Sequence, residues 1–144
     1  MILTLALSLV LLQGQVVTQG GPPPPPVPRN APAHLPNTPQ GKHVQAYIDA
    51  FNAGDEANFL KAQEALMAPD VLAKRPADQR AKMFARMRGD FGTLVVKRAV
   101  ATADTIRAVM LNKEGDEAIF SFEFDSKAPF KIKSIGVDIG NVER

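Results

Sequence analysis

Four segments in the second half of the chain alternate apolar and polar residues with a period of two. They run over 93–102, 105–113, 117–125 and 130–139. Such alternation predicts β-strands that are buried on one face. The links between the segments are only two to four residues long, whereas a parallel crossover needs about a dozen residues or more. The sequence therefore predicts a four-stranded antiparallel meander.

The third and fourth segments indicate which face of this sheet is covered. In 117–125 one parity is apolar and carries Ala118, Phe120, Phe122 and Phe124. In the fourth segment the apolar parity changes after Ile132, which predicts a β-bulge near Ser134 to Gly136 and a bend in the sheet. The phenylalanine row is expected to meet the helices.

Before Thr93 the apolar period is 3.6, as in amphipathic helices. The first helix carries Val44, Tyr47, Ile48 and Phe51 and ends at Asn52 and Gly54. A second runs from Asp55 to about Met67, a single turn follows at 69–72, and a third runs from Pro76 to about Asp90. The predicted fold class is α+β, with three N-terminal helices packed on a bent four-stranded antiparallel meander sheet over residues 40–144.

The N-terminus has the pattern of a secretory leader. Residues 2–12 form an apolar run that is shorter than the roughly 20 residues of a membrane-spanning helix. We interpret residues 1–20 as a signal peptide, which predicts a periplasmic or secreted protein. The alternatives are an uncleaved interfacial anchor, the one case in which we expect membrane contact, and a misassigned start codon.

Residues 21–39 are rich in proline, which disfavours both helix and sheet ladders. This pattern predicts a semi-rigid extended tether with a rise of about 3.1 Å per residue. A motif for a proline-binding partner is the alternative interpretation.

Charge and cysteine content exclude several classes of protein. Without Arg29, the only charged residue before Lys42, the domain has sixteen Lys and Arg against fifteen Asp and Glu. A nucleic-acid-binding domain needs a marked basic excess on one face, so we expect no nucleic-acid partner. The basic residues Arg80, Lys82, Arg86 and Arg88 are interpreted as a solvated helix face. The absence of cysteine excludes disulfides, a thiol nucleophile and a cysteine-ligated metal.

Four stretches carry a resemblance to a known family: 46–55 (AYIDAFNAGD), 75–80 (RPADQR), 89–94 (GDFGTL) and 128–132 (APFKI). They resemble the small domain that precedes the catalytic domain in some exported bacterial serine hydrolases of the beta-lactamase-like and C-terminal-processing-peptidase-like kinds. That domain is similar to the nuclear transport factor 2-like, or cystatin-like, cone fold. The sequence ends at Arg144, where the hydrolase domain would begin, so the resemblance implies an accessory domain without that catalytic partner.

No catalytic apparatus is evident from the residues. Ser121, Ser126 and Ser134 lack the Ser-x-x-Lys spacing, and His34 and His43 cannot form a multi-histidine metal site or a relay. We therefore predict no catalytic residues, no metal and no cofactor.

Two hypotheses for the function remain. The first is an exported, non-catalytic accessory or interaction domain that forms a homodimer or binds an envelope protein through the outer sheet face, where Val109, Leu111 and Ile119 add apolar surface. The second is a small-ligand binder, or a cofactor-free isomerase or lyase, that uses the interior of the cone. The candidate ligand-binding residues are Tyr47, Phe51, Arg98, Phe120 and Phe122. Arg98 shares the parity of Leu94 and Val96, so its guanidinium is expected on the helix side, where its partner is an anionic ligand or a helix acid such as Asp49.

Overall fold

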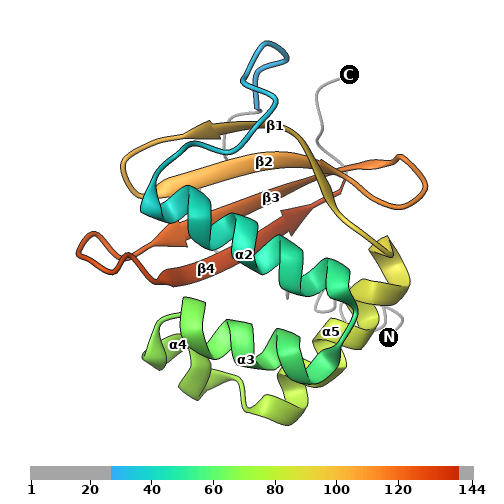
Figure 1. Ribbon diagram of the computed structural model, residues 1–144, viewed down its shortest axis with the longest axis vertical. Coiled ribbons are helices and arrows are strands. Elements are labelled where there is room, and N and C mark those ends of the chain that lie inside the picture. Colours follow the sequence, from blue (N-terminus) through green and yellow to red (C-terminus); the bar gives the residue numbers. More distant parts are fainter. Residues whose placement is uncertain (1–26, 140–144) are drawn as a thin grey trace, which may run out of the picture.

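The computed structural model describes residues 27–139. The predicted leader and the first part of the predicted tether, residues 21–26, lie outside the described residues. In chain order the elements are α2 (Pro39–Ala53), α3 (Glu56–Leu66), α4 (Pro69–Lys74), α5 (Ala77–Phe91), β1 (Val95–Ala101), β2 (Thr105–Leu111), β3 (Glu117–Phe124) and β4 (Ile132–Asp138). Figure 1 shows α2 lying across one face of the sheet, with α3, α4 and α5 beyond it. The predicted α+β class is confirmed, and the short α4 occupies the position of the predicted single turn.

The sheet has the strand order β1-β2-β3-β4, and all three pairings are antiparallel. The meander predicted from the short links is therefore confirmed. The fourth strand begins at Ile132 and not at Phe130, because Phe130 has a φ of 59° and belongs to the preceding turn.

Two irregularities in register decide which side chains face the helices. In β4, Ile132 pairs with Phe124 and Ser134 pairs with Glu123, so the bulged residue is Lys133. The predicted position, Ser134 to Gly136, was wrong by one residue, because Ile132 is fully buried and must share the inner face with Ile135. A second bulge, which was not predicted, lies at Lys97 in β1.

The caps of α2 follow from its sequence. The Thr38 side chain accepts a hydrogen bond from the Gly41 N–H, and Pro39 begins the helix, where its missing N–H costs nothing. Gly54 closes the helix in the left-handed conformation, with a φ of 75°. Asp55 then caps α3 by accepting the Asn58 N–H.

Asn52 does more than mark the end of the helix. Its side-chain amide donates to the Leu94 carbonyl and accepts from the Leu94 N–H, both at 2.9 Å. Asn52 therefore holds the start of β1 against the last turn of α2.

We expect Asn52→Ala to lower the free energy of unfolding by about 1–3 kcal/mol, because it leaves both backbone groups of Leu94 without their partner. Urea denaturation of the variant measures the loss. Asn58→Ala is the matched control, since the Asn58 side chain contacts Asp55 at the exposed surface, and its effect should stay within about 0.5 kcal/mol. Equal losses in the two variants would contradict this role for Asn52.

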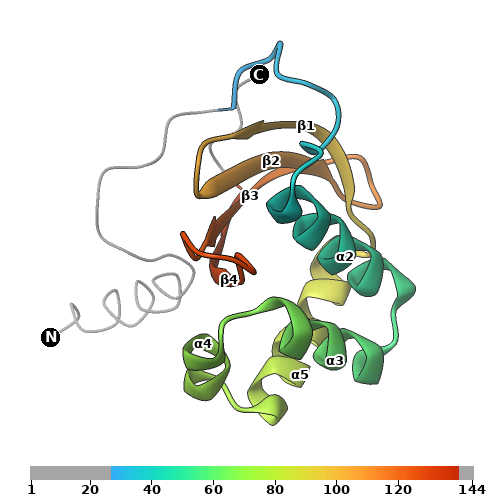
Figure 2. The ribbon, with the colours of Figure 1, turned by 60° about the vertical axis from the view of Figure 1, so that its left-hand side comes forward.

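Residues 27–38 pack on the domain, although they were predicted to belong to an extended tether. Val27 is buried against Val109 and Ile119 on the outer face of the sheet, and Ala31 packs beside it. The Ala99 N–H of β1 donates to the Pro32 carbonyl at 2.9 Å. Figure 2 shows this blue segment passing around the β1 edge of the sheet before it reaches α2. Burial of the Val27 side chain therefore stabilises a conformation in which residues 27–38 pack on the sheet, relative to an extended conformation in solvent.

Candidate binding site

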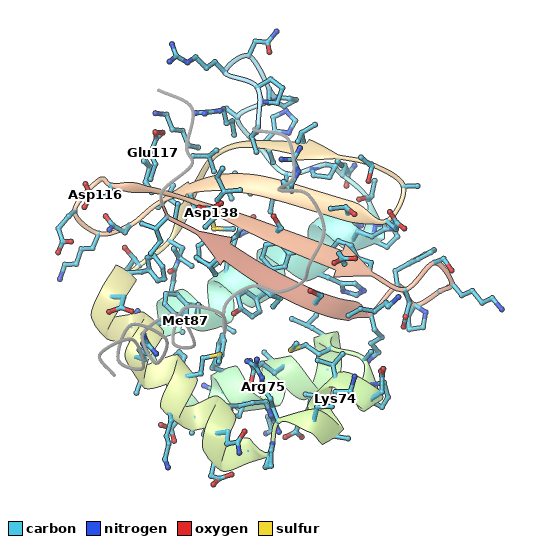
Figure 3. All side chains as sticks on the ribbon, turned by 180° about the vertical axis from the view of Figure 1, so that it is seen from behind. Lys74, Arg75, Met87, Asp116, Glu117 and Asp138 are labelled. Atoms are coloured by element: carbon cyan, nitrogen blue, oxygen red, sulfur yellow. The ribbon has the colours of Figure 1, made fainter. Side chains whose placement is uncertain are left out.

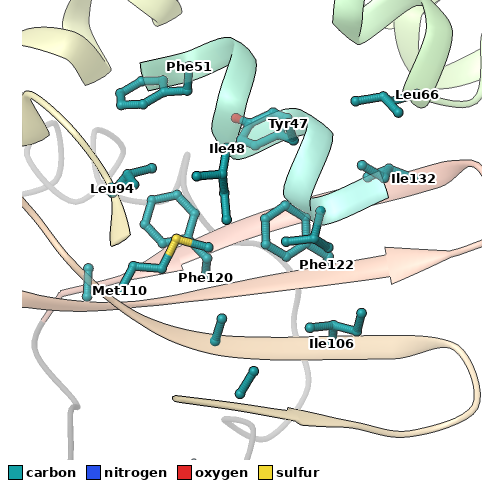
Figure 4. Close-up of a cluster of buried hydrophobic side chains, with 14 of the residues drawn as sticks. Tyr47, Ile48, Phe51, Leu66, Leu94, Ile106, Met110, Phe120, Phe122 and Ile132 are labelled. Atoms are coloured by element: carbon teal, nitrogen blue, oxygen red, sulfur yellow. The ribbon is translucent and has the colours of Figure 1, made fainter. Parts of the chain in front are cut away.

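The sequence predicted a ligand site inside the cone, and the structure brings four of its five residues together. Tyr47 and Phe51 come from α2, and Phe120 and Phe122 come from the inner face of β3 (Figure 4). Each is at most 3 % exposed. The four residues belong to one hydrophobic core cluster.

Aromatic rings fill the space around these residues. The Tyr47 ring lies 5.3 Å from Phe59 and 5.7 Å from Phe122 between centroids, in edge-to-face geometry. Phe51 packs in the same way on Phe59 and on Phe84, at 6.0 and 5.8 Å. These contacts are those of a packed core, which agrees with the expectation that the phenylalanine row of β3 meets the helices.

A hollow of about 240 Å³ lies elsewhere, at the turn between β3 and β4. It is lined by Asp125, Ser126, Lys127, Ala128 and Pro129. None of the five predicted ligand residues lines it.

Burial raises the pKa of Tyr47 well above its ordinary value, because the phenolate would lose its hydration in the apolar core. The hydroxyl therefore remains protonated at any pH at which the protein is handled.

This shift predicts a loss of stability in alkali. Above about pH 10 the unfolded chain loses the Tyr47 proton while the folded chain keeps it, so the free energy of unfolding falls by up to about 1.4 kcal/mol per pH unit. Tyr47 is the only tyrosine, so Tyr47→Phe removes the effect completely. Urea denaturation of both proteins from pH 8 to about pH 11.5 measures the difference, since other groups titrate alike in the two. Parallel stability curves would contradict the prediction.

Arg98, the fifth predicted site residue, lies on the opposite face of the sheet. It pairs with Val109 after the bulge at Lys97, and this extra residue turns its side chain to the outer face. The predicted orientation toward the helices was therefore wrong. Asp49, its expected partner, is instead exposed and accepts a hydrogen bond from Gln45.

The outer face gathers charged side chains around the apolar pair Val109 and Ile119. Figure 3 views the molecule from this side, with Glu117 and Asp138 labelled. Lys97 Nζ lies 2.8 Å from Glu117 Oε2, and Arg98 Nη1 lies 3.7 Å from the same oxygen. Glu117 therefore contacts both Lys97 and Arg98, and the contact with Lys97 is the shorter.

Arg98 and Arg107 are the unusual residues of this face. Arg98 is 6 % exposed, and its Nε and Nη2 atoms have no hydrogen-bond partner within residues 27–139. Arg107 Nη1 is likewise buried without a partner there, and burial lowers the pKa of Arg107 below its ordinary value. The pairing of Arg107 with Ser121 places it on the outer face. Arg107 was not among the predicted site residues; its alternation with Val109 and Leu111 is the local pattern that indicates a shared face.

Two members of the basic cluster on α5 bond within the domain: Arg80 is buried and Arg88 is half-buried. Arg80 is 9 % exposed and donates to the Arg75 carbonyl and to Gln63. Arg88 donates to the carbonyls of Phe51 and Gly92. The interpretation of all four residues as a solvated face was wrong for these two, because carbonyl groups at nearby helix ends and turns provide acceptors.

Within residues 27–139 no group of three or more His, Cys, Asp or Glu side chains is arranged to hold a metal ion. In the same part of the chain, no helix has the length and apolar character needed to cross a membrane.

Comparison of the chain with protein-family models gave no match, and comparison with curated proteins gave none either.

Proposed function

We propose that this chain is an exported, non-catalytic interaction domain of the bacterial cell envelope, and that it binds its partner through the outer face of the sheet. One observation carries the proposal. Among the described residues, the outer face holds two arginines with buried, unpaired N–H groups, whereas the inner face is occupied by a packed aromatic core. Buried polar groups are normally paired, so an unpaired set on one face is a reason to place binding there.

Export and location are supported by the sequence. The apolar run 2–12 has the length of a signal-peptide core, and the proline-rich segment after it is typical of a spacer. The resemblance to the small cone-fold domain of exported serine hydrolases points to the same location, periplasmic or secreted. We extend that resemblance to an accessory role.

A different envelope protein is a better partner than a second copy. In a twofold dimer both copies present the same patch, so the unpaired arginine N–H groups of each copy must find acceptors among the outer-face residues of the other. Glu117, which lies 3.7 Å from Arg98, already contacts Lys97 at 2.8 Å. A partner with its own acidic residues supplies such acceptors directly.

A second candidate function is supported by Tyr47. Its phenol is buried among aromatic rings and stays protonated, which suits a hydrogen-bond donor to an acceptor oxygen of a small, otherwise apolar ligand in the cone. Such a ligand would have to displace part of the aromatic packing.

Site-specific photocrosslinking in the native cell tests the proposed function. A photoreactive residue placed at Glu123, an exposed position on the outer face, should give one discrete crosslinked species in the envelope fraction. The same residue at Asp78, an exposed acidic position on α5, is the matched control and should give none. A product with twice the mass of the chain would identify a homodimer. Equal crosslinking from both positions, or a chain confined to the cytoplasm, would contradict the proposal.

A further inference from the structure

Arg98 and Arg107 are diagonal neighbours on the outer face. Arg98 pairs with Val109, and Val100 pairs with Arg107, so the two arginines lie on adjacent strands, two positions apart along the ladder and on the same face. Diagonal positions of this kind are about 7–8 Å apart at the backbone, which long side chains span easily. Two guanidinium groups can therefore converge on one ligand.

Part of their hydrogen-bonding capacity is not used within residues 27–139. Nε and Nη2 of Arg98 and Nη1 of Arg107 are buried and unpaired. The third nitrogen of Arg98, Nη1, lies 3.7 Å from Glu117 Oε2, and this distance is too long for a good hydrogen bond. Planar guanidinium groups suit carboxylate oxygens, with which they form charge-assisted hydrogen bonds.

A peptide segment of the chain already lies on this face. We call residues 27–32 the strap. The Val27 side chain packs on Val109 and Ile119, and the Pro32 carbonyl accepts the Ala99 N–H at the edge of β1. The strap contains Arg29 and no acidic residue, so it covers the apolar part of the face without neutralising the two arginines.

We propose that the outer face binds an acidic peptide segment of the partner, which replaces the strap and places a carboxylate between Arg98 and Arg107. This inference rests on the proposed function and adds the chemistry of the partner. The apolar positions Val100, Val109 and Ile119 would hold aliphatic or proline side chains of the peptide, as they now hold those of the strap. A free inorganic anion has no apolar group that could pack on these three side chains.

Nuclear magnetic resonance of the full chain, isolated from cells that express it, tests the proposal. The probe is the peptide acetyl-Glu-Val-Pro-Glu-Val-Pro-amide, and its counterpart with Gln in place of both Glu is the neutral control. The acidic peptide should shift the Nε–H signals of Arg98 and Arg107. It should also shift the backbone amide of Ala99, which loses the Pro32 carbonyl when the strap leaves. The neutral peptide should leave these signals in place.

Two arginine variants provide the matched comparison. Arg98→Met removes the guanidinium but keeps an apolar side chain of similar length, and Glu117 keeps its contact with Lys97, so the change leaves Glu117 paired. It should weaken binding of the acidic peptide about tenfold or more while the dispersed spectrum of the folded domain persists. Arg86→Met makes the same change on the exposed face of α5 and should leave the affinity unchanged.

A variant of the strap tests the competition. Val27→Ser removes the apolar contact with Val109 and Ile119, so it should raise the affinity for the acidic peptide about threefold or more. Unchanged affinity would overturn the idea that the strap and the peptide share one site.

Three other outcomes would overturn the inference. These are the absence of shifts with the acidic peptide, equal affinity in Arg98→Met, and the same shifts produced by inorganic phosphate at equal concentration. The photocrosslink from Glu123 distinguishes failure of the acidic-peptide proposal from failure of the proposed function. If the crosslinked species persists in Arg98→Met while the peptide does not bind, the outer face is an interface and only the acidic-peptide assignment is wrong.

Discussion

Phe120→Ala is expected to lower the free energy of unfolding by about 3–5 kcal/mol, a severe loss for a domain of this size. Phe120 is fully buried on the inner face of β3, and its ring lies 5.6 Å from Phe91 and 6.4 Å from Phe122. Truncation removes these contacts and leaves a cavity between the sheet and the helices. Because small domains have only about 5–15 kcal/mol of stability, the variant should be marginally folded.

Thermal denaturation measures this effect. For a domain of about 100 residues, a loss of about 4 kcal/mol corresponds to a fall in Tm of roughly 15–30 °C. Val95→Ala is the control in the same sheet, because Val95 is 58 % exposed, and its effect should stay within about 0.5 kcal/mol. If Phe120→Ala unfolded within a few degrees of the parent, the interior around Phe120 would not be tightly packed.

Arg88→Met should lower the free energy of unfolding by about 2–4 kcal/mol, because it removes charge-assisted bonds to two carbonyl groups. The guanidinium of Arg88 joins the ends of α2 and α5 by donating to the Phe51 and Gly92 carbonyls, and it lies 5.6 Å from the centre of the Phe51 ring. Cations are favourable at helix C-termini, and hydrogen bonds from charged groups are stronger than neutral ones. Methionine keeps the apolar stem and removes all of these interactions.

Arg86→Met is the matched control on the same helix. Its side chain is 76 % exposed and lies 3.9 Å from Asp90, a geometry in which an ion pair contributes less than about 0.5 kcal/mol. Urea denaturation of the two variants gives the comparison. A similar loss for both would mean that Arg88 acts only through general charge and not through its bonds to the two helix ends.

The sequence alone determined most of the architecture, because local patterns control it. The 3.6 and 2.0 periods separate helices from strands, Gly54 and Asp55 mark the junction of α2 and α3, and short links allow only antiparallel neighbours. The inward direction of the Phe120 and Phe122 side chains follows from the same alternation.

The tertiary structure decided the candidate site, because that site depends on contacts between residues far apart in the chain. The alternation along β1 predicted that Arg98 shares a face with Leu94 and Val96. The bulged residue Lys97 reverses this alternation, so the Arg98 side chain lies on the outer face. Similarly, proline content predicted an extended tether through residue 39, and only the apolar surface of Val109 and Ile119 explains why Val27 packs there. A bulge and a nonlocal apolar contact are set by packing across the sheet, which no local period encodes.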